Sequence, residues 1–246
     1  MEVYIFELSA TYVHHSDPKY MWEFSKQILK NMELAGHIDK KYRSWIKKYR
    51  MLIMKYFELQ FYDNDSYLLN VSKVDRHKYI TCPTCKMILN KRSLIEEHLP
   101  TYKIKRKKYH LSGSYDGFKM VSQKFKDLYE ISNWQGLMFY SIPKSKGFYL
   151  IECSQQIMLN EAKRPIEFEN KCNECGSYMG IYGSVPLYID ADMFQKLKPN
   201  TFYRSNLEFG FDFEQDYCLF ASQEITEKLI EHKLIIEKDL IEVCSI

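Results

Sequence analysis

The feature that most constrains how this chain can fold is a repeated Cys-x-x-Cys motif. Cys82 and Cys85 form the first pair, Cys172 and Cys175 form the second, and 86 residues separate the two pairs. A Cys-x-x-Cys turn presents two thiolates from one tight loop, and two such turns that face each other form a closed tetrahedral site for a zinc-like ion. The spacing therefore predicts a metal site that brings two distant parts of the chain together.

The composition of this predicted site indicates a structural role for the metal. Four protein sulfur ligands leave no open coordination position for a substrate, so we expect a structural Zn²⁺, with a rubredoxin-like iron as the alternative. A thioredoxin-like redox pair is disfavoured, because neither pair has the strand-to-helix context that lowers a thiol pKa. Buried thiols or transient disulfides are the other alternative. The remaining cysteines, Cys153, Cys218 and Cys244, lie in apolar or strand-like surroundings and are expected to be buried free thiols.

Length and composition fit one large domain or two small ones. The chain has 246 residues, of which 46% are hydrophobic and 27% are charged. We expect an α+β fold in which a helical N-terminal region, residues 1–75, packs on a mixed or antiparallel β-containing domain, residues 76–246, clipped by the zinc-ribbon-like site of four cysteines; one continuous domain is the alternative. The first residues indicate a strand rather than a signal peptide, and no apolar run approaches the roughly 20 residues of a membrane span, so a soluble cytoplasmic protein with no membrane association is expected.

Hydrophobic periodicity and capping residues predict the secondary structure. Helices are expected over about 18–35 and 42–56, and a strand over 67–71. Further along, the expected helices are 92–98, 123–131, 190–197 and one that begins at Ser222, and the expected strands are 137–142, 147–152, 185–190, 201–209 and 234–243. The pair Ser122-Gln123 recurs at an offset of 100 residues as Ser222-Gln223. This likeness indicates either two copies of a helix-then-strand unit or a chance similarity of two capped helices.

Charge is distributed unevenly along the chain. The net charge is +3, yet the segment from Asn206 to the end contains ten acidic and three basic residues, so the remainder is strongly basic. A basic cluster interleaved with aromatic residues precedes residue 111 and comprises Lys103, Lys105, Arg106, Lys107 and Lys108. Such a cluster is typical of nucleic-acid binders, and zinc ribbons often bind nucleic acid. Solvated charged faces are the alternative for both segments.

Motifs for catalysis are weak or missing. The sequence contains no phosphate loop, nucleophile elbow, zinc-protease helix or dinucleotide fingerprint. His14 and His15 are neighbours whose side chains would point to opposite faces of a strand, and Asp190 and Asp192 resemble a metal-binding pair of some sugar transferases, although helix capping is the favoured role. We therefore expect a protein that is not an enzyme.

The layout from about Lys78 to the C-terminus resembles the double-CXXCG motif protein family. The likeness is carried by both cysteine pairs, by Gly176 after the second pair, by the strand 186–190 and by the closing helix that begins at Ser222. The first pair departs from the family motif, because Lys86 stands where the family has glycine. Members of that family are similar to immunity proteins of bacterial polymorphic or contact-delivered toxin systems.

The resemblance implies a non-enzymatic, cytoplasmic, metal-stabilised antidote that binds and blocks a cognate protein toxin. In that case the acidic C-terminal segment, with Glu208, Asp212, Glu214 and Asp216, is expected to cover the basic cleft of a toxin such as a nuclease. The alternative function is a zinc-ribbon nucleic-acid-binding protein that uses the basic stretch 103–108.

Overall fold

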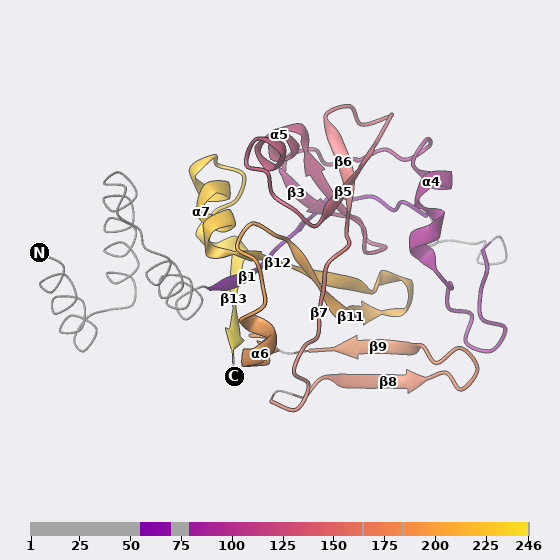
Figure 1. Ribbon diagram of the computed structural model, residues 1–246. Helices are drawn as coiled ribbons and strands as arrows, with labels where there is room; N and C mark the ends of the chain where they lie inside the picture. Colours follow the sequence, from indigo (N-terminus) through magenta and orange to yellow (C-terminus); the bar gives the residue numbers. More distant parts are fainter. Residues whose placement is uncertain (1–54, 70–78, 164, 184, 246) are drawn as a thin grey trace, which may run out of the picture. The chain divides into compact units, whose positions relative to one another are not determined.

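The computed structural model describes residues 55–69, 79–163, 165–183 and 185–245, and Lys55–Ile246 forms one compact unit (Figure 1). The helices expected before residue 55, the strand expected at the start of the chain, and the expected boundary between residues 75 and 76 lie outside these residues. Inside them the fold is a mixture of helices and strands, as expected. None of the helices in these ranges has the length and apolar character that crossing a bilayer requires.

The larger sheet has eight strands within the described part of the chain. Its order is β10-β13-β1-β12-β11-β9-β8, and the short β7 pairs with β11. Most neighbours are antiparallel, while β7 with β11 and β10 with β13 are parallel. Its strands are β1 (Tyr56–Leu59), β7 (Gln156–Ile157), β8 (Glu167–Lys171), β9 (Tyr178–Tyr182), β10 (Tyr188–Ile189), β11 (Tyr203–Phe211), β12 (Asp216–Ser222) and β13 (Leu240–Ser245).

The smaller sheet has five strands among the same residues, in the order β2-β3-β4-β6-β5. They are β2 (Tyr62–Asp63), β3 (Leu111–Gly113), β4 (Lys119–Ser122), β5 (Leu137–Ser141) and β6 (Phe148–Cys153). Successive side chains of a strand point to opposite faces. Accordingly, Met120 and Leu150 belong to one apolar cluster, while Val121 and Ile151 belong to another.

The two clusters divide the core. The first joins both sheets and the two longest described helices, and its fully buried members include Phe125, Phe202, Leu219, Ile225 and Leu229. The second lies on the other face of the five-stranded sheet, beneath the short helical segments η2 (Lys91–Leu94) and α4 (Ile95–His98). The other short helical segments are α6 (Ala191–Phe194), η3 (Asp212–Glu214) and η4 (Glu237–Asp239).

The two longest described helices, α5 (Gln123–Ile131) and α7 (Gln223–Glu231), are built alike. The hydroxyl oxygen of Ser122 accepts a hydrogen bond from the Phe125 N–H, and Ser222 does the same for Ile225, both at 3.3 Å. Each helix follows a strand that ends in the capping serine, β4 before α5 and β12 before α7, and each leads to another strand. The expected capping of both helices is confirmed.

The likeness extends past the helix ends. Asn133 and Lys233 both have positive φ angles, 51° and 57°, and the next residue, Trp134 or Leu234, donates its N–H to the carbonyl oxygen five positions earlier. This left-handed turn is a common way to end a helix. The two strand-helix-strand units therefore agree at both ends of their helices.

Several expected elements have different bounds. Tyr56 lies in β1 rather than in a helix, and Tyr67 to Leu69 are not in a strand. The strand expected to begin at Leu234 begins at Leu240, because a connection containing η4 comes first. Burial explains the error at Tyr56: the residue is 0% exposed between β12 and β13, so sheet pairing overrides its helical spacing.

Candidate metal centre

The fold brings the four predicted cysteines together. Cys82 and Cys85 lie in the loop before η2, and Cys172 and Cys175 lie in the turn between β8 and β9 (Figure 1). The Sγ atoms of Cys82 and Cys172 are 3.7 Å apart, as are those of Cys85 and Cys175, and all four lie within 4.8 Å of one another. The prediction that the two pairs face each other is confirmed.

These distances fit a single tetrahedral metal ion. A zinc–sulfur bond of about 2.3 Å places neighbouring sulfur atoms of a tetrahedron about 3.8 Å apart. The two short distances match this edge, and all four cysteines are free thiols. The cluster can therefore hold a metal ion with protein sulfur alone.

The two turns have the same backbone geometry. In each, the first cysteine donates its N–H to the carbonyl oxygen five residues later, Cys82 to Met87 at 2.9 Å and Cys172 to Ser177 at 2.8 Å. In each, the residue four positions after the first cysteine donates its N–H to the carbonyl oxygen of that cysteine. This residue has a positive φ, 62° at Lys86 and 75° at Gly176. Lys86 thus adopts the conformation that glycine adopts in the second turn, so the departure from the double-CXXCG pattern leaves the turn intact.

We expect opposite effects from substitutions at these two positions. A non-glycine residue in the left-handed region costs about 1–2 kcal/mol, and an added Cβ at residue 176 would meet no atom within 4 Å, so Gly176→Ala isolates the backbone strain. It should lower the free energy of unfolding by about 1 kcal/mol. Lys86→Gly should raise it by up to about 1 kcal/mol, because relief of strain exceeds the added flexibility of the unfolded chain. Urea unfolding of the metal-loaded protein measures both, and equal losses would contradict the shared geometry.

The thiols of the four clustered cysteines differ in pKa. Hydrogen bonds from the side chain and backbone of Ser177 lower the pKa of Cys175 to about 6, whereas desolvation raises the pKa of Cys85 to about 12. Four thiolates this close repel one another unless a cation lies between them. A bound metal ion would stabilise all four as thiolates.

The segments that carry the two cysteine pairs also contact a third part of the chain, the hairpin tip formed by residues 211–215, from the last residue of β11 to the residue before β12. Lys91, five residues beyond the first turn's Lys86, donates from Nζ to the carbonyl oxygens of Phe213 and Gln215. From the other side, Nε2 of Gln215 donates to the carbonyl oxygen of Tyr178 at 3.0 Å, immediately after the second turn. The segments that follow the two cysteine turns therefore both hydrogen-bond to this hairpin tip.

A buried ion network lies next to this contact and was not foreseen from the sequence. The guanidinium of Arg92 is 2.7 Å from Glu152, 3.3 Å from Glu208 and 3.4 Å from Asp216, and Lys119 also pairs with Asp216. Burial alone would lower the pKa of Arg92, but these carboxylates raise it above its ordinary value. The five residues of the network come from four strands and a 3-10 helix. No pattern within a short stretch of sequence therefore predicts it.

Aromatic rings complete the surroundings of these cations. The Arg92 guanidinium lies 4.7 Å from the centre of the Tyr217 ring and 5.2 Å from that of Phe118. Lys119 Nζ lies 5.0 Å from the same Tyr217 ring. Desolvated cation–π contacts of this kind are worth about 2 kcal/mol, so the network is stabilised by more than its ion pairs.

The four acids predicted to contact a partner lie in different surroundings. Glu208 and Asp216 are half-buried in the ion network with Arg92. Asp212 and Glu214 belong to η3 at the hairpin tip, where Glu214 is exposed. The structure therefore separates Glu208 and Asp216, which are engaged by Arg92, from half-buried Asp212 and exposed Glu214 at the hairpin tip.

The predicted basic stretch lies in an exposed connection before β3. Its five cations are exposed, and Arg106 pairs with Asp65 at 2.6 Å, while Lys108 lines a cavity described below. Asp190 is the N-cap residue of α6, but its side chain accepts from Asn160 rather than from the helix. His14 and His15 lie outside the described residues.

Comparisons with protein-family models, with characterised proteins and with solved structures find no match to this chain.

Proposed function

We propose that this protein is a non-enzymatic binding protein, stabilised by one structural Zn²⁺, that neutralises a cognate bacterial toxin. The observation that carries the proposal is the closed set of four cysteine sulfurs, whose two segments both hold the hairpin tip. A metal with four protein ligands has no position for substrate, so its contribution is to shape. Rigid surface loops held in this way lose less entropy on binding a partner.

Zinc is the proposed ion because its chemistry suits four thiolates in a tetrahedral arrangement. It has no redox chemistry and no geometric preference from d-electrons, and closed sites with four cysteine ligands are a common structural form. Iron in the same cage would give a coloured, redox-active protein. Elemental analysis of protein purified under reducing conditions distinguishes the two, and we expect one zinc per chain.

The hairpin tip is the proposed contact surface. Phe211 is 48% exposed, and the neighbouring Asp212 and Glu214 are acidic. Aromatic side chains are enriched at protein–protein interfaces, where they serve as anchors, and a polar rim surrounds them. Two acids beside such an anchor favour a basic partner, which agrees with a nuclease toxin whose cleft attracts nucleic acid.

Growth rescue tests this proposal. Co-expression with an active toxin encoded beside the gene should restore growth of a host that the toxin alone arrests, and the two proteins should co-purify. Phe211→Ala combined with Glu214→Lys should weaken the association at least about tenfold, because it removes the anchor and reverses a charge beside it. Glu161→Lys is the matched control, since Glu161 is exposed and lies outside the hairpin tip.

One outcome would refute toxin neutralisation, and another would refute the proposed contact surface. One is arrested growth despite soluble, metal-loaded protein and a toxin of verified activity. The other is full association of the double variant, which would exclude the hairpin tip as the contact surface.

A further inference from the structure

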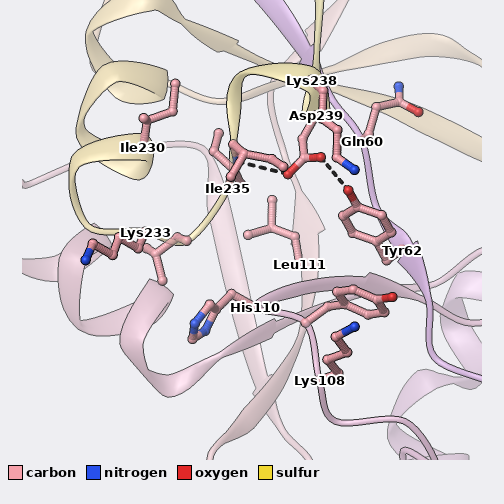
Figure 2. A pocket seen from close by; sticks show the side chains of 13 residues that line it. Gln60, Tyr62, Lys108, His110, Leu111, Ile230, Lys233, Ile235, Lys238 and Asp239 are labelled. Carbon is pink, nitrogen blue, oxygen red and sulfur yellow. Dashed lines mark hydrogen bonds between the residues drawn. The ribbon is translucent and has the colours of Figure 1, made fainter.

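A cavity of about 430 Å³ lies between the five-stranded sheet and the connection from α7 to β13 (Figure 2). One wall comes from Tyr62 of β2 and from the segment that enters β3, and the other comes from residues 230–239. A volume of this size suits a small organic ligand. The cavity is distant in sequence from both cysteine pairs, and none of the four cysteines lines it.

The wall that carries Asp239 is fixed in place. The Asp239 carboxylate accepts a hydrogen bond from the Tyr62 hydroxyl at 2.5 Å through one oxygen and from the Ile236 N–H at 3.0 Å through the other. The Gln60 N–H donates to the Asp239 carbonyl oxygen at 2.9 Å. These bonds join the two walls, so the cavity is formed before any ligand binds.

The cavity has an excess of positive charge. Lys108 and Lys238 point toward it from below and above, whereas the ammonium of Lys233 points away (Figure 2), and neither Lys108 nor Lys238 has an ion-pair partner among the residues that the structure describes. Asp239 is the one carboxylate among the described lining residues, and both of its oxygens are already engaged. The lysines are therefore available to an anion.

The interior of the cavity favours a flat ring. Tyr62 and Tyr109 are stacked, with ring centres 4.3 Å apart and planes inclined by 14°, and both are half-buried. Leu111 lies at the centre of the view, and Ile230 and Ile235 add apolar surface beside it (Figure 2). Stacking of a nucleobase on such an aromatic wall is worth about 1–3 kcal/mol.

The cavity occurs where the two strand-helix-strand units differ. β5 begins six residues after the end of α5, whereas β13 begins nine residues after the end of α7. The longer connection contains η4, which supplies Lys238 and Asp239. Loops that vary on a repeated scaffold are common sites of binding.

From this combination we infer that the cavity binds a nucleotide, with the base against the Tyr62–Tyr109 wall and the phosphate groups at Lys108 and Lys238. The same chemistry belongs to a free nucleotide and to one unit of a single-stranded nucleic acid. Phosphate contacts give affinity that depends on salt, and the stacked ring gives a contribution that inorganic phosphate lacks. This inference does not depend on toxin neutralisation or on the hairpin tip.

Calorimetric titration of the full chain at low salt tests the inference, with ADP, adenosine, inorganic phosphate and single-stranded (dT)8 as probes. We expect saturable 1:1 binding of ADP, with adenosine and phosphate each at least about tenfold weaker. Tighter binding of (dT)8 than of ADP would identify a nucleic-acid strand as the source, and weaker binding would identify a free nucleotide. No saturable binding of either ADP or (dT)8 would overturn the inference.

Variants then assign the binding to this cavity. Lys108→Ala with Lys238→Ala should weaken binding of the tighter probe at least about tenfold, and Tyr109→Ala about fivefold or more. Lys103→Ala with Lys105→Ala is the control, because these lysines are exposed on the same connection and do not line the cavity. An equal loss in the control pair would show diffuse electrostatic attraction and overturn the assignment. The lysine variants alter exposed side chains only, so they test the site even if Tyr109→Ala does not fold.

Discussion

Stability of this protein is expected to rise with free zinc concentration by about 1.4 kcal/mol per tenfold increase once the site is above its dissociation constant. The reason is that the four sulfurs meet only in the folded chain, where they lie within 4.8 Å of one another although the pairs are 86 residues apart. An ion that binds the native state and not the unfolded chain stabilises by mass action. Urea unfolding in a series of zinc buffers gives the slope directly, and a single ion per chain predicts this value.

Removal of the metal has a correspondingly large effect. At a zinc concentration about 1,000 times the dissociation constant the ion contributes about 4 kcal/mol, which is a large part of the stability of an ordinary domain. Chelation or Cys172→Ser should therefore lower the midpoint of unfolding markedly, while Cys244→Ser, at a half-buried cysteine of β13 outside the cluster, should leave the zinc dependence unchanged. A stability that does not respond to zinc or to chelation would contradict a structural metal at this site.

Much of the metal centre could be predicted from sequence because its signals are local. A Cys-x-x-Cys turn determines its own shape through backbone hydrogen bonds within six residues. The presence of a second such motif indicates which residues supply the other two ligands. The same is true of the helices that begin after Ser122 and Ser222, since a capping hydroxyl acts within its own turn. Lys86 was visible as a departure from a glycine motif, but only its φ of 62° shows that the turn tolerates lysine.

The largest features that sequence reasoning missed are long-range. Tyr56 follows a helical spacing, yet pairing with Ser222 and Val243 places it in the centre of a sheet. The cavity joins Tyr62 to Asp239, and the ion network joins Arg92 to Asp216, so the partners are 177 and 124 residues apart in the sequence. Patterns over short windows do not encode which distant side chains will meet.

The network around Arg92 leads to the second large expected effect. Three carboxylates, from Glu152, Glu208 and Asp216, face one guanidinium in an environment where Glu152 is 8% exposed. Removing one partner of a buried pair costs about 3–5 kcal/mol, because the other charge stays buried without compensation. Here that charge is Glu152, since Asp216 keeps Lys119, and Glu208 keeps Lys91 and Arg204. Arg92→Ala should therefore lower the free energy of unfolding by about this amount, with a further loss from the cation–π contacts with Phe118 and Tyr217.

Arg106→Ala is the control, because it removes an ion pair of similar length that is exposed to solvent. It therefore shows how much of the loss in Arg92→Ala is due to burial. Arg106 lies 2.6 Å from Asp65, closer than Arg92 lies to any of its partners, but the two side chains are 47% and 35% exposed. Solvent-exposed pairs contribute about 1 kcal/mol or less. Urea unfolding of both variants in the presence of zinc should therefore give a difference of at least about 2 kcal/mol, since burial and not distance sets the cost. Similar losses for the two variants would mean that Arg92 is solvated in solution, and the network would then not be holding η2 against β11 and β12.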